Sequence, residues 1–157
     1  MEKSVQIAHR FREVFLDGTW IANTNYKMQL SNITWKQAIT KVESLNTIAA
    51  LAFHINYYLA GVLNIFEGGT LDIRDKYSFD MPEITSEEDW NDLLNTLITN
   101  AEKFVKKVEL MSDEKLEAFF VEKKYGTYRR NIEGMIEHSY YHLGQISLIK
   151  KMMTENE

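Results

Sequence analysis

Cysteine is missing from all 157 residues of the chain. Its absence excludes disulfides, thiolate metal ligands and a cysteine nucleophile. A chain without disulfides fits the reducing cytoplasm, where we expect this protein to reside. If thiol chemistry takes place at this protein, the thiol must be carried by a small molecule.

Proline and glycine are scarce, with one proline and seven glycines in the chain. Few residues therefore interrupt regular structure, which favours long helices. Long apolar runs are also lacking: the longest, residues 48–58, is broken by His54 and Asn56 and is too short to span a bilayer. Charged residues interrupt the N-terminal segment, so no signal peptide is predicted. We expect no membrane partner.

An excess of positive charge is absent as well. The net charge is −5 and the isoelectric point is about 5.4. These values leave no electrostatic footprint for nucleic acid, which we exclude as a partner. The length suits a single domain with a sizeable core, so residues 1–157 are expected to form one domain.

Four long helices are predicted from apolar residues that recur three and four positions apart. The first covers residues 3–16, and the second, capped by Ser44 or Asn46, runs to Ile65. The third follows a capping box formed by Ser86 and Asp89 and runs to residue 108, and the last covers about residues 127–153.

The segments between these helices show weaker patterns. Residues 34–42 are expected to form a short helix capped by Ser31 or Asn32. Residues 20–31 and 70–85 lack a clear period and are expected to be irregular. Four long amphipathic helices with long irregular connections indicate an all-α four-helix bundle.

The segment EGMIEHSYYHLGQISLIK, residues 133–150, carries two histidines one helical turn apart. Residues four apart lie on one face of a helix, so His138 and His142 are expected to point the same way. His54 lies in the middle of the most apolar helix and is the natural third partner. Three neutral histidines with an open position form a metal site that leaves room for catalysis.

A structural role is the alternative for these three histidines. A pair at this spacing arises often by chance, and Ser139 occupies the position where the zinc-protease motif needs a glutamate. Three of the four histidines nevertheless lie at core-facing positions in helices, and each buried imidazole needs polar partners. This concentration favours the metal site.

Two segments resemble the DinB-like superfamily: EHSYYHLGQISLIKK near the C-terminus and LNTIAALAFHINYYLAGVLNIFEGG earlier in the chain. The resemblance implies a four-helix bundle, often dimeric, with a divalent metal, nickel or zinc, held by three histidines. By position these ligands are His54, His138 and His142. The resemblance further implies a homodimer and a transferase or isomerase reaction with a small thiol such as bacillithiol or mycothiol.

Further residues are candidates for lining a pocket or supporting a ligand. Gln145 lies two turns beyond His138 and can orient a ligand or form an interhelical hydrogen bond. Tyr58 and Asn131 are pocket candidates on the histidine-bearing faces. Arg74 can meet an anionic substrate or form an ion pair with Asp72 or Asp75.

Two more residues are interpreted from their positions. Gly134 either opens space near the metal or permits close helix packing. His9 is expected to be exposed and not to bind the metal.

Three functions remain open at the level of sequence, each with a small molecule as the expected substrate or ligand. The first is a metal-dependent enzyme that activates a small thiol. The second is a metal-dependent hydrolase, for which a carboxylate base is needed and only Glu133 and Glu137 are close in sequence. The third is a non-enzymatic stress-response module for binding or dimerisation. No catalytic residue is assigned.

Overall fold

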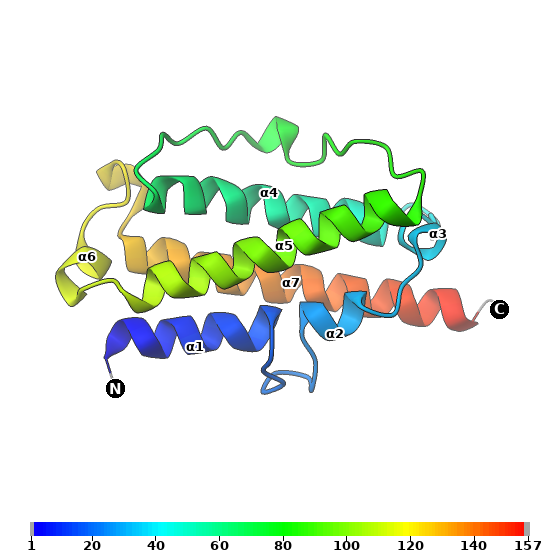
Figure 1. Cartoon of the computed structure of the whole chain (residues 1–157), viewed down its shortest axis with the longest axis horizontal. Helices are drawn as coiled ribbons and strands as arrows, with labels where there is room; N and C mark the ends of the chain where they lie inside the picture. Colours follow the sequence, from blue (N-terminus) through cyan, green and yellow to red (C-terminus); the bar gives the residue numbers. More distant parts are fainter. Residues whose placement is uncertain (1, 156–157) are drawn as a thin grey trace.

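The computed structural model describes residues 2–155, and these residues form an all-α fold (Figure 1). The helices are α1 (Lys3–Phe15), α2 (Tyr26–Leu30), α3 (Trp35–Ala38), α4 (Ile48–Phe66), α5 (Glu87–Glu109), α6 (Asp113–Glu117) and α7 (Tyr128–Glu155). Single turns of 3-10 helix occur at Asp75–Tyr77 and Lys123–Tyr125. The expected all-α class is confirmed.

The four long helices α1, α4, α5 and α7 lie lengthwise beside one another (Figure 1). Helix α5 packs against α1 and α4, and α7 packs against the same two helices. The apolar stripes of the four helices meet in a continuous core. On α7, the stripe consists of four residues that are at most 3% exposed: Ile132, Ile136, Leu143 and Ile146. This is the stripe that the sequence period predicts.

Helix α4 is the most apolar helix and packs against both α5 and α7. By length and composition alone, this helix is long and apolar enough to cross a membrane. Of its most apolar 18-residue stretch, 56% is buried inside the fold. The buried core helix of a soluble protein can have the same length and apolar composition. Burial of this helix places His54 among apolar neighbours.

The caps of two helices differ from the sequence expectation. Thr34, not Ser31 or Asn32, caps α3, and its side chain accepts a hydrogen bond from Gln37 N. Thr47, not Ser44 or Asn46, caps α4 by accepting from Ala50 N at 3.1 Å. Side-chain chemistry alone does not separate these candidates, because Ser, Thr and Asn all favour the N-cap. For α4, the position of the cap follows from where the helix enters the core, since Ile48, the residue after Thr47, is completely buried.

The cap of α5 is at the expected residue. Ser86 Oγ accepts a hydrogen bond from Asp89 N at 3.1 Å. The Asp89 carboxylate accepts from the backbone N and the hydroxyl of Thr85, each at 2.9 Å. The helix therefore begins where predicted, but the Asp89 carboxylate accepts from Thr85 and does not complete the expected capping box with Ser86 N.

Residues 20–31 are less irregular than expected because they contain α2. Asn25 caps this helix by accepting from Met28 N at 2.8 Å. Five helical residues are too few to display a hydrophobic period, which explains why the pattern gave no signal. Tyr26 is fully buried, and its hydroxyl donates to the carbonyl of Ser139 at 2.7 Å. This bond joins the connection to α7 beside the histidines.

The connection from α4 to α5 returns along α4 (Figure 1). A Cβ on Gly61 would collide with the side chain of Ile73, so the glycine allows the connection to lie against the helix. The Tyr57 hydroxyl donates to Arg74 O at 3.1 Å and accepts from Arg74 N at 2.9 Å. These contacts place Asp75 and Phe79 beside His54.

Candidate metal centre

Three histidines meet between α4 and α7. His138 Nε2 lies 3.2 Å from His54 Nε2 and 2.9 Å from His142 Nε2. One ligand atom from each residue lies within 4.8 Å of the others, so the group can hold a metal ion. His54 and His142 are each 7% exposed, and His138 is half-buried. The expected convergence of these residues is confirmed.

The distances from His138 Nε2 to the other two Nε2 atoms fit a single divalent ion. Metal–nitrogen bonds of about 2.0–2.1 Å place two neighbouring imidazole nitrogens roughly 2.8–3.4 Å apart, from octahedral to tetrahedral coordination angles. The distances of 2.9 and 3.2 Å agree with this range. All three residues present Nε2 to the shared centre.

Gln145 fixes the proton of one ring. His142 Nδ1 lies 2.6 Å from Gln145 Oε1. An amide oxygen only accepts hydrogen bonds, so Nδ1 of the neutral ring carries the hydrogen and Nε2 keeps its lone pair. Metal-binding histidines usually have such a partner on the second nitrogen. The sequence interpretation of Gln145 as a residue that orients a ligand is consistent with this contact.

Without a metal ion, hydrogen bonds cannot pair all the ring nitrogens of the three histidines. His138 Nε2 can donate one hydrogen, to His142 or to His54, and not to both. His54 Nδ1 is buried and has no hydrogen-bond partner among residues 2–155. The Ser78 backbone lies near His54 and raises the pKa of this histidine, but its contact with the ring does not reach hydrogen-bond geometry. A cation bound to the three Nε2 lone pairs would fix every ring as an Nδ1–H tautomer.

Burial keeps the rings neutral. Desolvation, followed by the neighbouring His142 and His54, lowers the pKa of His138 from 6.5 to about 4. Desolvation is also the main cause that lowers the pKa values of His54 and His142. Neutral imidazole is the form that binds a metal, so these rings are ready to bind at neutral pH.

Aromatic rings surround the cluster. Phe79 stacks on His54 with ring centroids 4.2 Å apart and planes at 15°. Tyr58 meets His54 and His138 edge-on at 5.0 and 5.2 Å. Tyr141 meets His142 at 4.9 Å. These rings restrict water around the imidazoles.

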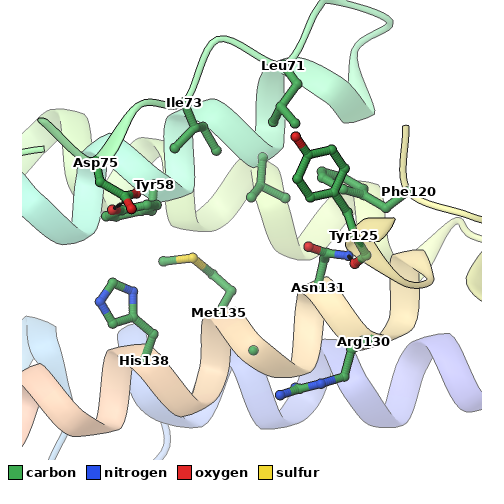
Figure 2. A pocket seen from close by; sticks show the side chains of 12 residues that line it. Tyr58, Leu71, Ile73, Asp75, Phe120, Tyr125, Arg130, Asn131, Met135 and His138 are labelled. Carbon is green, nitrogen blue, oxygen red and sulfur yellow. Dashed lines mark hydrogen bonds between the residues drawn. The ribbon is translucent and has the colours of Figure 1, made fainter. Parts of the chain in front are cut away.

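A pocket of about 470 Å³ opens beside His138 (Figure 2). Its lining comes from α4, α7 and two connections: Tyr58, Val62, Leu71, Ile73, Asp75, Phe120, Tyr125, Arg130, Asn131, Gly134, Met135 and His138. Figure 2 shows His138 at one end, below Tyr58 and Asp75, with Phe120 and Tyr125 at the other. The candidate metal site therefore has access to a space for a ligand.

The three pocket candidates have different roles. Tyr58 lines the pocket, and its hydroxyl donates to Asp75 Oδ1 at 2.7 Å. Asn131 lines the pocket, but its Nδ2 donates to the carbonyls of Tyr125 and Thr127, each at 2.8 Å, so its amide hydrogens are already used. Gln145 contacts His142 and is not among the lining residues.

Arg74 forms no ion pair with Asp72 or Asp75 within residues 2–155, so that interpretation is wrong. Asp75 accepts from Tyr58, and Asp72 accepts from the Thr70 hydroxyl at 2.9 Å. Arg74 contributes its backbone to Tyr57, and it does not line the pocket.

For Gly134 and His9, the structure supports one of the interpretations made from the sequence. A Cβ on Gly134 would come no nearer than 3.6 Å to Arg130 Nη1, so this glycine leaves space in the pocket and does not serve close packing. His9 has a side chain that is 68% exposed and paired with Glu13, away from the cluster.

The carboxylate beside the cluster is Asp75, which the sequence analysis did not select for this role. Glu137 forms an ion pair with Arg130 at 3.0 Å, and Glu133 forms one with Arg129 at 3.3 Å. Asp75 lies in the pocket lining, and its negative charge raises the pKa of His54. It comes from an aperiodic connection, and no local pattern places such a segment against a distant helix.

Comparison of the chain with protein-family models, with curated proteins and with solved structures gave no match. No family assignment follows from these comparisons. Function is therefore inferred from the histidine cluster and the pocket beside it.

Proposed function

We propose that the protein is a divalent-metal enzyme of the DinB-like four-helix-bundle type that transfers or isomerises a small molecule with the help of a low-molecular-weight thiol. The observation that carries the proposal is the convergence of three Nε2 atoms, 2.9 and 3.2 Å apart, at one end of a pocket. Three histidine ligands leave at least one coordination position for a reactant, as in catalytic zinc sites.

Different residues would hold the ion, orient its ligands and bind the reactant. A bound divalent ion would acidify a coordinated thiol and polarise an electrophile. His54, His138 and His142 would hold the ion, and Gln145 would keep the His142 ring in its orientation. Tyr58 and the pocket beyond it would hold the reactant, since Tyr58 lines the pocket.

Two observations favour a thiol reaction. The chain has no cysteine, so a nucleophilic sulfur must arrive on a separate molecule. The histidine segments resemble those of the DinB-like superfamily, in which thiol-dependent transferases and isomerases occur. Imidazole ligands suit both nickel and zinc, the two ions that the resemblance implies. The same resemblance supports our proposal of a homodimer.

A thiol-consumption assay tests the proposal. Chain loaded with nickel or zinc is mixed with bacillithiol, mycothiol or glutathione and a panel of electrophiles, and loss of free thiol is followed. We expect metal-dependent consumption that disappears in His138→Ala, because a ligand is lost. Metal-loaded protein that consumes no thiol with any electrophile would refute the thiol reaction.

A metal-dependent hydrolase is the second candidate, and Asp75 favours it. The carboxylate lines the pocket with His138 and is held by the Tyr58 hydroxyl, so it is placed to accept a proton from a water molecule. The variant Asp75→Asn separates the candidates. Loss of ester or amide hydrolysis with intact metal content would support the hydrolase, and metal-dependent thiol consumption without hydrolysis would exclude it.

The pocket also bears on the non-enzymatic alternative. A binding or dimerisation module is favoured by histidines sealed from solvent. Here His138 is half-buried and lines a pocket of about 470 Å³. Such access favours a reaction over a purely structural metal.

A further inference from the structure

We propose that the pocket beside His138 binds the apolar body of the reactant, so that the natural ligand is amphipathic. Its reacting polar end would lie at the histidine cluster, and a hydrocarbon or aromatic body would extend toward Phe120 (Figure 2). This inference rests on the proposed function and adds the class of substrate to it.

Apolar groups form somewhat more than half of the pocket's accessible lining. Helix α4 contributes Val62, the following connection contributes Leu71 and Ile73, and α7 contributes Met135. The volume of about 470 Å³ lies within the range of small-molecule sites, which runs from about 300 to 1,000 Å³. The pocket therefore has room for more than the head group of a thiol.

Several polar groups in the lining already have partners within the protein. The Nδ2 group of Asn131 donates to two backbone carbonyls at 2.8 Å each. Arg130 is paired with Glu137 at 3.0 Å. Asp75 accepts from Tyr58 at the histidine end. A ligand body in the middle of the pocket therefore meets side chains that offer apolar contact.

The far wall is held in place by a strained turn. Phe119 and Thr127 form an isolated antiparallel bridge, and Phe120 N donates to Gly126 O at 2.8 Å. Val121 has φ of 56°, which is unfavourable for a β-branched residue and needs support from its surroundings. Phe120 is only 2% exposed, whereas Phe119 and Val121 are 56% and 50% exposed. The turn thus directs Phe120 inward.

Ligand affinity should increase with apolar length. Each buried methylene group strengthens binding about fourfold when it leaves water for an apolar site. From ethanethiol to hexanethiol, four additional methylene groups should tighten binding by about 250-fold when all four are buried. The increase should end when the pocket is filled.

Cobalt-loaded protein provides the measurement. Ethanethiol, butanethiol and hexanethiol are titrated separately, and the thiolate-to-cobalt charge-transfer band gives each dissociation constant. Gly134→Leu is the test variant, because Gly134 lines the pocket and a Cβ there meets no atom within 3.4 Å. Leucine also favours the helix, so folding is expected to be preserved. Circular dichroism verifies it.

Gly144→Leu is the matched control. Gly144 is also in α7, is exposed, does not line the pocket, and has space for a Cβ. We expect Gly134→Leu to lose most of the gain in affinity from ethanethiol to hexanethiol, because leucine would fill space along the pocket. Gly144→Leu should retain the full gain.

The outcomes separate the inference from the proposed function. Binding of ethanethiol with no gain for hexanethiol would overturn the inference and leave the thiol reaction standing. The same gain in Gly134→Leu and Gly144→Leu would show that the alkyl chain lies elsewhere, which also overturns it. No band with any thiol, despite bound cobalt, would reject the thiol reaction and the inference together.

Discussion

Replacing His54 with leucine should stabilise the metal-free protein while abolishing metal binding. His54 is 7% exposed, and no group in the described part of the chain forms a hydrogen bond with its Nδ1. A buried polar group without a partner costs about 1–3 kcal/mol. Leucine removes this cost and loses the ring stacking on Phe79, which contributes about 0.5–1.5 kcal/mol. The net expectation is a gain of about 1 kcal/mol in the free energy of unfolding.

Urea and thermal unfolding of chelator-treated protein at pH 7.5 measure this effect. The pKa values of all three clustered histidines are lowered, so the rings are neutral at this pH and charge does not enter the comparison. A gain of about 1 kcal/mol raises the midpoint of thermal unfolding by about 2–4 °C in a protein of this length. His9→Leu is the control, because an exposed histidine should change stability by less than about 0.5 kcal/mol.

The sign of the change distinguishes a metal site from a structural network. If His54 formed essential hydrogen bonds in the core, its replacement would lower the stability of the metal-free protein by about 1–3 kcal/mol. Such a loss, with His9→Leu unchanged, would refute the reasoning from the unpaired Nδ1.

Three further outcomes follow from the contacts. Gln145→Leu should weaken metal binding about 10- to 100-fold in a chelator competition, because His142 loses the partner of its Nδ1, and Gln145→Glu should retain most of the affinity. The pKa of His138 is about 4 in the folded protein, against an ordinary value of 6.5. Between pH 4 and 6.5, the unfolded chain therefore binds a proton at this residue that the folded protein does not bind. The metal-free protein should therefore lose stability as pH falls from 6.5 toward 4, by at most about 3 kcal/mol from this group, and urea midpoints of His138→Leu should depend less on pH. Tyr26→Phe should lower the free energy of unfolding by about 1 kcal/mol, because the hydrogen bond to Ser139 O is lost, with no change in metal content.

The long helices and the histidine cluster were accessible from sequence because both depend on local periodicity. The spacing of His138 and His142 fixes their common direction along α7. The position of His54 in the middle of α4, the most apolar helix, indicated that it faces the core. Together these features predicted the contact between two helices that are 84 positions apart at His54 and His138.

The groups around the cluster were not accessible in this way. Asp75 and Phe79 belong to a connection without a hydrophobic period, and its path depends on the space at Gly61 and the bonds of Tyr57. These are long-range contacts that no local pattern encodes. The missed helix α2 and the shifted helix caps have a related cause, since tertiary packing selects among residues with equal local preference.

Metal content of the tag-free purified chain, measured by mass spectrometry beside His54→Leu, His138→Ala, His142→Ala and His9→Ala, tests the metal centre most directly. We expect about one nickel or zinc ion per chain in the unchanged protein and in His9→Ala, because the three other histidines form the site. Each of the other variants should contain almost none while remaining helical. An unchanged chain that contains no ion and takes up none from excess nickel or zinc would contradict the metal centre and make the cluster structural.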